Sequence, residues 1–150
     1  MLFPLAFCAH GTIRFHLFTE NMNGELYREI LINNLFDQAQ QLYGGSWKFQ
    51  QDNDPKHTCK KAQTWFQDHD FNVLLWPAQS PDLNPIEHLW DHLKRQLAGH
   101  EVAPSGILQL WERVEEEWNK IDAKVCQNLI ESMPRRVAAV LKAKGGYTKY

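Results

Sequence analysis

The chain has 150 residues, of which 43% are hydrophobic and 12% aromatic, so it can bury a core and is not a disordered polypeptide. Its formal net charge of −2 gives no indication of nucleic-acid binding from the chain as a whole. Three widely spaced cysteines without a CxxC pair argue against a disulfide framework or a cysteine-rich zinc site, and fit a reducing compartment.

Two strands and a long helix are predicted in the first third of the chain. Residues 2–8 are apolar, and the short run favours a buried strand over a signal peptide or a membrane span. A turn is expected at residues 9–11, and residues 12–19 then alternate between apolar and polar side chains, as a half-buried strand does. Residues 21–43 have apolar side chains at helical spacing.

Strands and helices alternate in the next part of the chain. We predict a strand at residues 47–51, a helix that begins near Thr58, and an apolar strand at residues 71–77 with both faces covered. Strands that alternate with helices predict an α/β fold with a parallel sheet covered by helices. Three amphipathic helices are predicted after this region, at residues 86–97, 104–121 and 134–144.

Asp52 directly follows the predicted strand at residues 47–51. In open α/β sheets, ligands bind beyond the carboxyl ends of the strands, so Asp52 is a candidate functional residue. The sequence Asp52-Asn53-Asp54-Pro55 also fits an Asx-turn that leads into a helix. Both interpretations stay open from these residues alone.

Glu87 lies at the start of the predicted helix at residues 86–97. Asn84 can cap this helix, Pro85 suits its first position, and Glu87 would then complete a capping box. This helix follows the strand adjacent to the one that ends at Asp52, so both acids are expected near the same edge of the sheet. Capping and metal binding are compatible, because a carboxylate has two oxygen atoms.

Two carboxylates at one sheet edge suit a magnesium site. Mg²⁺ prefers oxygen ligands and typically takes one or two carboxylates together with substrate phosphates. Two ions about 3.5–4 Å apart can activate a nucleophile and stabilise the leaving oxygen of a phosphodiester. A pair of acids is weak evidence for such a site without further motifs.

The last segment of the chain is basic. Residues 132–150 contain no acid and five basic residues, which are Arg135, Arg136, Lys142, Lys144 and Lys149. Such a segment can contact phosphates. The alternative is a helix that packs through Val137, Val140 and Leu141 and exposes a basic side to water.

Three segments closely resemble the catalytic domain of Tc/mariner superfamily transposases. They are WKFQQDNDPKHT (47–58), NVLLWPAQSPDLNPIEHLW (72–90) and SMPRRVAAVLKAKGGYTKY (132–150), and residues 9–31 resemble the family segment that leads up to them. Thirty-four residues separate Asp52 from Glu87. This is the spacing of the second and third acids of the family's Asp-Asp-Glu triad.

The resemblance implies a ribonuclease-H-like fold that cuts and rejoins double-stranded DNA at transposon ends with Mg²⁺ or Mn²⁺. Asp52 and Glu87 would be catalytic metal ligands. DNA contacts are expected from Lys56, His57, Arg135 and Arg136. For His57, a role in shaping the site and a structural hydrogen bond stay open beside the DNA contact, and the structural hydrogen bond is favoured. It also implies a nuclear protein whose partner is a second copy or a parent transposase chain.

The sequence departs from the family pattern in one respect. The first triad Asp of the family lies on a strand ahead of the segment that residues 1–11 resemble, and none of the acids before Asp52 is placed to replace it; they are Glu20, Glu25, Glu29 and Asp37. We therefore expect residues 1–150 to form a partial catalytic domain, without the first strand and without the DNA-recognition helices. The chain alone would be inactive. The alternative is a non-catalytic remnant that binds DNA or a partner.

Overall fold

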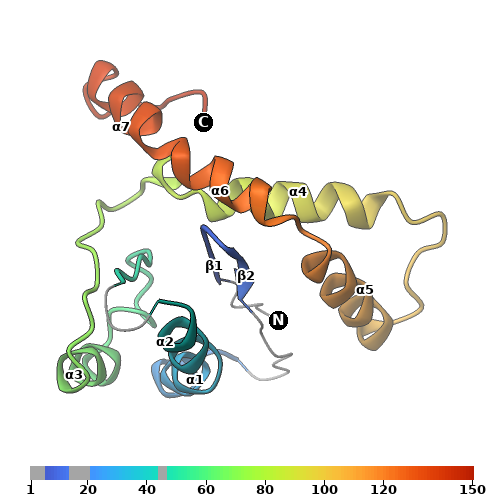
Figure 1. The fold of residues 1–150 in the computed structure, drawn as a ribbon, viewed down its shortest axis with the longest axis horizontal. Coiled ribbons are helices and arrows are strands. Elements are labelled where there is room, and N and C mark those ends of the chain that lie inside the picture. The colour runs from blue at the N-terminus through green and yellow to red at the C-terminus, as the bar shows by residue number, and fades with distance from the viewer. Residues whose placement is uncertain (1–5, 14–20, 44–46) are drawn as a thin grey trace. The chain divides into compact units, whose positions relative to one another are not determined.

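The computed structural model describes residues 6–13, 21–43 and 47–150 (Figure 1). The chain forms two compact units, one of residues 1–6 and 13–79, the other of residues 7–12 and 80–150. The elements in chain order are β1 (Ala6–Cys8), β2 (Gly11–Ile13), α1 (Gly24–Ile30), the π-helical segment η1 (Leu31–Phe36), α2 (Asp37–Tyr43), α3 (Lys60–Asp68), the 3-10 turn η2 (Pro81–Leu83), α4 (Ile86–Ala98), α5 (Ile107–Asn119), α6 (Ala123–Glu131) and α7 (Met133–Lys142).

The strands β1 and β2 pair in a two-stranded sheet. The predicted turn between them is confirmed. Gly11 has a positive φ of 132°, a backbone conformation that residues other than glycine rarely adopt. The rest of the two predicted strands, residues 2–5 and 14–19, lies outside the described residues.

The predicted long helix is confirmed as the continuous run of α1, η1 and α2. It begins after Asn23, whose side chain accepts hydrogen bonds from the backbone nitrogens of Glu25 and Leu26 at 3.0 and 2.9 Å. α1 packs against α3. The buried core between these helices comprises Ile13, Tyr27, Leu31, Leu35, Ala62, Trp65 and Phe66.

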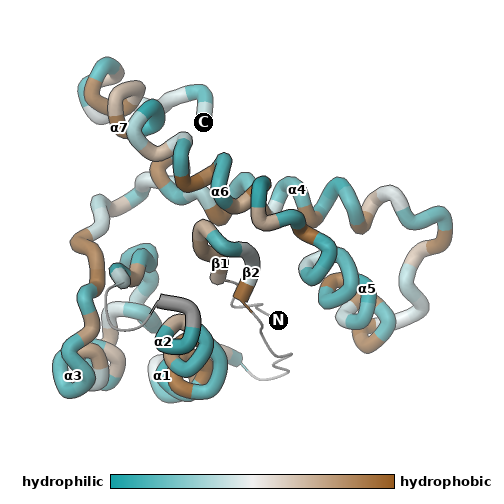
Figure 2. The backbone as a smooth tube through the Cα atoms, in the orientation of Figure 1, coloured by the Kyte–Doolittle hydropathy of each residue, from teal (hydrophilic) through white to brown (hydrophobic). Residues whose placement is uncertain are grey.

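The two predicted parallel strands are shorter than expected. Their pairing consists of one parallel bridge between Phe49 and Val73, with hydrogen bonds of 2.9 Å from Phe49 to Asn72 and 2.8 Å from Leu74 to Phe49. The hydrophobic stretch that follows α3 is visible in Figure 2. Leu75 within it is 100% exposed, so the prediction that both faces of this strand are covered is wrong at this position.

The second unit is built from helices. α4 packs against α5, and α7 contacts both α6 and η2. α6 is absent from the prediction, although Asp122 provides a recognisable cap: its side chain accepts a 2.7 Å hydrogen bond from the backbone nitrogen of Lys124. The buried apolar side chains of this unit are Leu83, Leu89, Leu93, Val114, Trp118, Ile121 and Cys126.

In the described part of the chain, no helix is both long enough and apolar enough to cross a membrane.

Candidate functional site

Asp52 follows the bridged strand and forms the predicted Asx-turn. Its Oδ1 accepts a 3.1 Å hydrogen bond from the backbone nitrogen of Asp54, and the same oxygen lies 2.6 Å from Nδ1 of His57. The Asp52 side chain is 55% exposed, and its Oδ2 accepts no hydrogen bond from any described residue. The turn therefore uses one oxygen of Asp52 and leaves the other without a hydrogen bond from the described residues.

Asp54 is fully engaged within the same loop. Its two carboxylate oxygens accept hydrogen bonds from the backbone nitrogen and from Nζ of Lys56, at 2.9 and 2.8 Å. Burial opposes the charged form of Asp54, but the hydrogen bonds from the Lys56 side chain and backbone outweigh it and hold the pKa of Asp54 below its ordinary value. Of the two acids, Asp52 is thus the one with a free oxygen.

His57 is packed into the first unit. Its side chain is 22% exposed, and its ring lies on that of Tyr27 with 4.3 Å between ring centroids. The Tyr27 hydroxyl donates to Oε1 of Gln51, whose Nε2 donates to the backbone carbonyl of His57 at 3.4 Å. Burial, followed by the charges of Asp52 and Asp54, raises the pKa of Tyr27, so the phenol stays a hydrogen-bond donor.

The Asp52 loop is also tied to the neighbouring chain segment. Nδ2 of Asn53 donates a 2.8 Å hydrogen bond to the backbone carbonyl of Trp76. Because Asp52 follows Phe49 and Trp76 follows Val73, both lie on the carboxyl side of the parallel bridge. This is the side of a parallel pair where ligands are expected.

Glu87 lies exposed in the first turn of α4. Pro85, not Asn84, occupies the capping position, and no side chain caps the helix there. The predicted capping box is wrong, because Pro85 has no backbone N–H that could donate a hydrogen bond to Glu87. No described residue donates a hydrogen bond to the Glu87 carboxylate. A carboxylate at this end of a helix is nevertheless favoured by the helix dipole.

The loop before α4 is held by Arg136, which is only 2% exposed. Its Nη1 donates to the carbonyl of Asp82 at 3.0 Å, its Nε donates to Oγ of Ser132 at 2.7 Å, and its guanidinium lies 4.9 Å from the Tyr150 ring centroid. Oγ1 of Thr148 donates to Oδ2 of Asp82 at 2.9 Å. Arg136 therefore supports the start of α4, and its burial does not favour the predicted phosphate contact.

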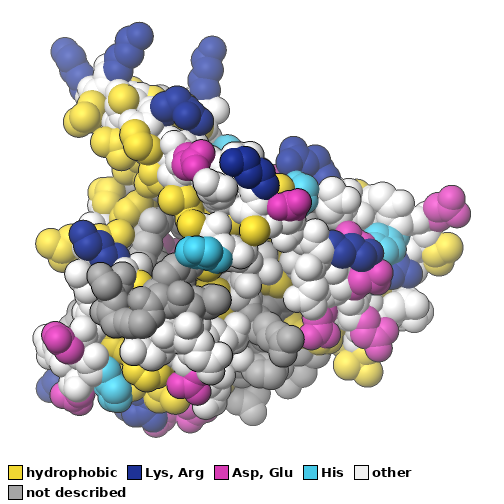
Figure 3. All heavy atoms as spheres, in the orientation of Figure 1, with side chains coloured by type: hydrophobic (Ala, Val, Ile, Leu, Met, Phe, Trp, Pro, Cys, Tyr) yellow, Lys and Arg dark blue, Asp and Glu magenta, His cyan; other side chains and the backbone are white. Residues whose placement is uncertain are grey.

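The other predicted DNA contacts differ in exposure. Arg135 is exposed on α7, whereas Lys56 is half-buried against Asp54. Figure 3 shows Lys and Arg side chains together with hydrophobic ones over α7. The alternative of a helix that packs through Val137, Val140 and Leu141 is wrong for Val137 and Leu141, which are exposed, Leu141 to 72%, whereas Val140 is half-buried.

Asp52 and Glu87 belong to different compact units, so their convergence on a shared ion stays a prediction. Among the described residues, no three His, Cys, Asp or Glu side chains gather into a metal-binding cluster.

The sequence motifs did not indicate the contacts of Tyr27 or Asp82, because each contact joins residues distant in sequence.

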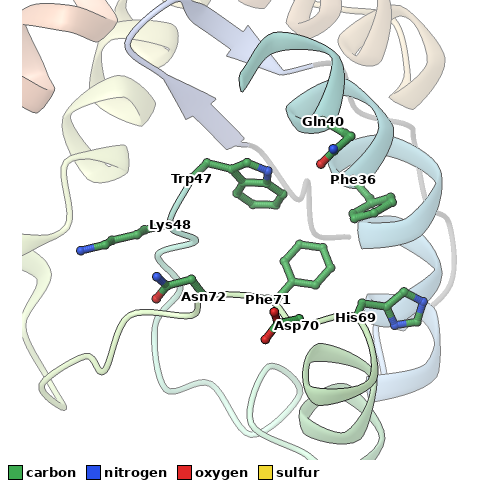
Figure 4. Close-up of a pocket in the computed structure, with 8 residues that line it drawn as sticks. All are labelled: Phe36, Gln40, Trp47, Lys48, His69, Asp70, Phe71 and Asn72. Carbon is green, nitrogen blue, oxygen red and sulfur yellow. The ribbon is translucent and has the colours of Figure 1, made fainter. Parts of the chain in front are cut away.

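A cavity of about 920 Å³ lies in the first unit, on the amino side of the parallel bridge and thus away from Asp52. The rings of Phe36, Trp47 and Phe71 point toward one another in it, with centroid separations of 5.3 and 5.1 Å to Phe71 (Figure 4). Its full lining is Phe36, Gln40, Trp47, Lys48, His69, Asp70, Phe71 and Asn72. None of the candidate acids lines this cavity.

The fold is ribonuclease-H-like. It matches the solved Mos1 transposase catalytic domain with Raltegravir and Mg at a TM-score of 0.83, with 23% identity, over 97% of this chain and 75% of that one. It also matches a Mos1 transposase paired-end complex with the left transposon end, at a TM-score of 0.81 and 24% identity, over 95% of this chain and 43% of that one. At these identities the likeness shows the fold.

The sequence identifies the family. The profile described as "DDE superfamily endonuclease" matches residues 3–106. The chain is 49% identical over 129 residues to the Tcb1 transposable element transposase of Caenorhabditis briggsae, which covers 86% of this chain. The chain belongs to the DDE superfamily endonucleases, as a Tc/mariner transposase catalytic domain. It spans about half of that relative's length, 46%.

Proposed function

We propose that the chain forms part of a centre that cleaves DNA and joins the cut strands at transposon ends. Asp52 and Glu87 are the metal ligands of this centre. The observation that carries the proposal is the state of these two carboxylates: both are exposed, and each has at least one oxygen without a hydrogen bond from the described residues. The transposase relative and the Mos1 catalytic domain with Mg support the same function.

The two acids suit Mg²⁺ or Mn²⁺ by the chemistry of their donor atoms. Both offer hard carboxylate oxygens, and such ions need only one or two from the protein. A bound ion supplies a Lewis acid that activates the nucleophile and stabilises the leaving oxygen of a phosphodiester. Asp52 contributes Oδ2, while its Oδ1 stays bonded to the turn and to His57.

We also propose that the 150-residue chain alone carries out no strand transfer. The family triad has three acids, and the described acids ahead of Asp52 all lie on helices. Glu25 is paired with Lys61 at 2.6 Å and Asp37 begins α2. Without a third ligand the nucleophile would be misplaced, and small displacements cost on the order of 100-fold in rate.

DNA and a second transposase chain are the proposed partners, in the nucleus. The Mos1 paired-end complex contains a transposon end. In this chain, Arg135 is exposed for phosphate contact and Lys142 lies in the last turn of the same helix. The second candidate function, DNA or partner binding without cleavage, is favoured by this basic side of α7 and by the exposed Leu141 beside it.

Binding of Mn²⁺, followed by electron paramagnetic resonance, tests the proposed site. The variants Asp52→Asn and Glu87→Gln should each weaken Mn²⁺ binding. Asp68→Asn and Asp91→Asn are matched controls, because both residues are exposed acids. Asp68 lies on α3, the helix that follows the Asp52 loop, and Asp91 lies on α4, the helix that contains Glu87. Equal Mn²⁺ affinity in Asp52→Asn and wild type would contradict the proposed site and leave the DNA-binding alternative.

A further inference from the structure

We propose that His57 is a positioning residue that fixes the orientation of the Asp52 carboxylate. This inference rests on the proposed function, because it assigns His57 a role through the metal ligand Asp52. The sequence leaves a DNA contact, a site-shaping role and a structural hydrogen bond open for His57, and its surroundings in the structure favour a role in supporting the site.

A hydrogen bond joins His57 to Asp52. Nδ1 of His57 lies 2.6 Å from Oδ1 of Asp52, and without it the Asp52 side chain keeps only the 3.1 Å bond from the Asp54 backbone. A side chain that is 55% exposed has few packing contacts to restrict its rotation. Two hydrogen bonds on Oδ1 restrict the rotation of the carboxylate and leave Oδ2 without a hydrogen bond from the described residues.

His57 is itself held from several directions. Its ring lies 4.3 Å from the ring of Tyr27, which is buried in the core between α1 and α3. Its backbone nitrogen donates to the Asp54 carbonyl at 2.9 Å, and its own carbonyl accepts from Gln51 at 3.4 Å. The buried Tyr27 ring thus orients the imidazole of His57, and this imidazole orients the Asp52 carboxylate.

A ligand orientation of this kind has a measurable effect. Groups that hydrogen-bond a metal ligand and fix its orientation typically change metal affinity by about 10- to 100-fold when removed. A purely structural role for His57 would lower stability but leave the metal affinity of the folded chain unchanged. A role in DNA contact would change DNA affinity alone.

Two substitutions separate the ring from the nitrogen. His57→Phe keeps a ring on Tyr27 and removes the bond to Asp52, while His57→Asn keeps a nitrogen donor near the Nδ1 position and removes the ring. We expect His57→Phe to weaken Mn²⁺ binding about 10-fold, and His57→Asn to restore most of the affinity. Thermal melting of the same samples confirms that each variant is folded.

The chain provides a matched control in His69. It also lies on an aromatic ring, Trp65, at 4.9 Å, and its Nδ1 contacts a backbone carbonyl at 2.9 Å, but on the amino side of the parallel bridge. His69→Phe should leave Mn²⁺ affinity unchanged.

The outcomes distinguish the two proposals. If Asp52→Asn weakens Mn²⁺ binding and His57→Phe binds as wild type does, the positioning role of His57 is overturned and the metal site stands. If Asp52→Asn itself has no effect, both are overturned. Weakening by His57→Phe with recovery in His57→Asn supports the positioning role.

Discussion

Arg136 donates a hydrogen bond to the backbone carbonyl of Asp82 at 3.0 Å, across 54 residues of sequence. This bond joins α7 to the loop that leads into α4, and Glu87 lies in the first turn of that helix. Arg136, which the sequence predicts as a DNA contact, is therefore a structural support of the second unit.

Replacement of Arg136 by lysine should destabilise the second unit by about 2 kcal/mol. Lysine cannot reproduce the bonds to both Asp82 and Ser132, and hydrogen bonds to a charged group are worth about 1.5–3 kcal/mol. Urea unfolding followed by tryptophan fluorescence measures the loss. Arg135→Lys at the exposed neighbouring position should stay within about 0.5 kcal/mol of wild type; equal losses in the two variants would contradict this role of Arg136.

Gly24 at the start of α1 should not tolerate alanine. A Cβ atom there would lie 2.2 Å from Sγ of Cys59, so either the helix or Cys59 must move. We expect a loss of about 1–3 kcal/mol in the free energy of unfolding. The double variant Gly24→Ala with Cys59→Ala should recover most of it, and additive losses in a double-mutant cycle would show that the two residues do not clash.

Truncation to alanine should hardly change the free energy of unfolding at Leu75 and should lower it strongly at Leu89. Leu75 is fully exposed, so Leu75→Ala should change the free energy of unfolding by no more than about 0.5 kcal/mol. Leu89 is fully buried, and Leu89→Ala should cost about 2–5 kcal/mol. A large loss from Leu75→Ala in chemical unfolding experiments would indicate that this side chain is packed in solution.

Cys126 should be unreactive in the folded chain. The thiol is fully buried, and burial raises its pKa from 9.0 to about 11. Because the folded-state pKa is the higher one, the stability contributed by this thiol is complete below pH 9 and is lost as the pH rises toward 11.

Titration with a thiol reagent at pH 8 checks this. Cys8 and Cys59 are partly exposed and should react first, and Cys126 should react only after denaturant is added. Rapid modification of all three thiols in the native chain would contradict the buried position of Cys126. The Cys126→Ser variant identifies the slow thiol.

The sequence predicts the helices well, because their apolar spacing is local information. The run from Gly24 to Tyr43 and the helix that begins at Ile86 are both recognisable in this way. The shortness of the parallel pairing could not be predicted, because strand pairing depends on neighbours distant in sequence. α6 was missed although Asp122 is a good cap, since its nine residues form a short pattern beside two stronger ones.

The candidate site follows the same division. The motif spacing predicts Asp52 and Glu87 as site residues, and the Asx-turn at Asp52 is local and was predictable. A structural hydrogen bond from His57 was expected too, but its partner Asp52 was not, because the direction of the imidazole depends on the buried Tyr27 ring. The burial of Arg136 was also unpredictable, because a basic run gives no sign of which side chain turns inward.

The central claim is that Asp52 and Glu87 bind one common ion, and iron-mediated cleavage of the chain tests it most directly. Fe²⁺ in place of Mg²⁺ generates radicals that cut the backbone close to the bound ion, and mass spectrometry locates the cuts. We predict cuts near both residue 52 and residue 87, with both sets lost in either Asp52→Asn or Glu87→Gln. Cuts near residue 87 that persist in Asp52→Asn would show two independent sites and contradict the claim.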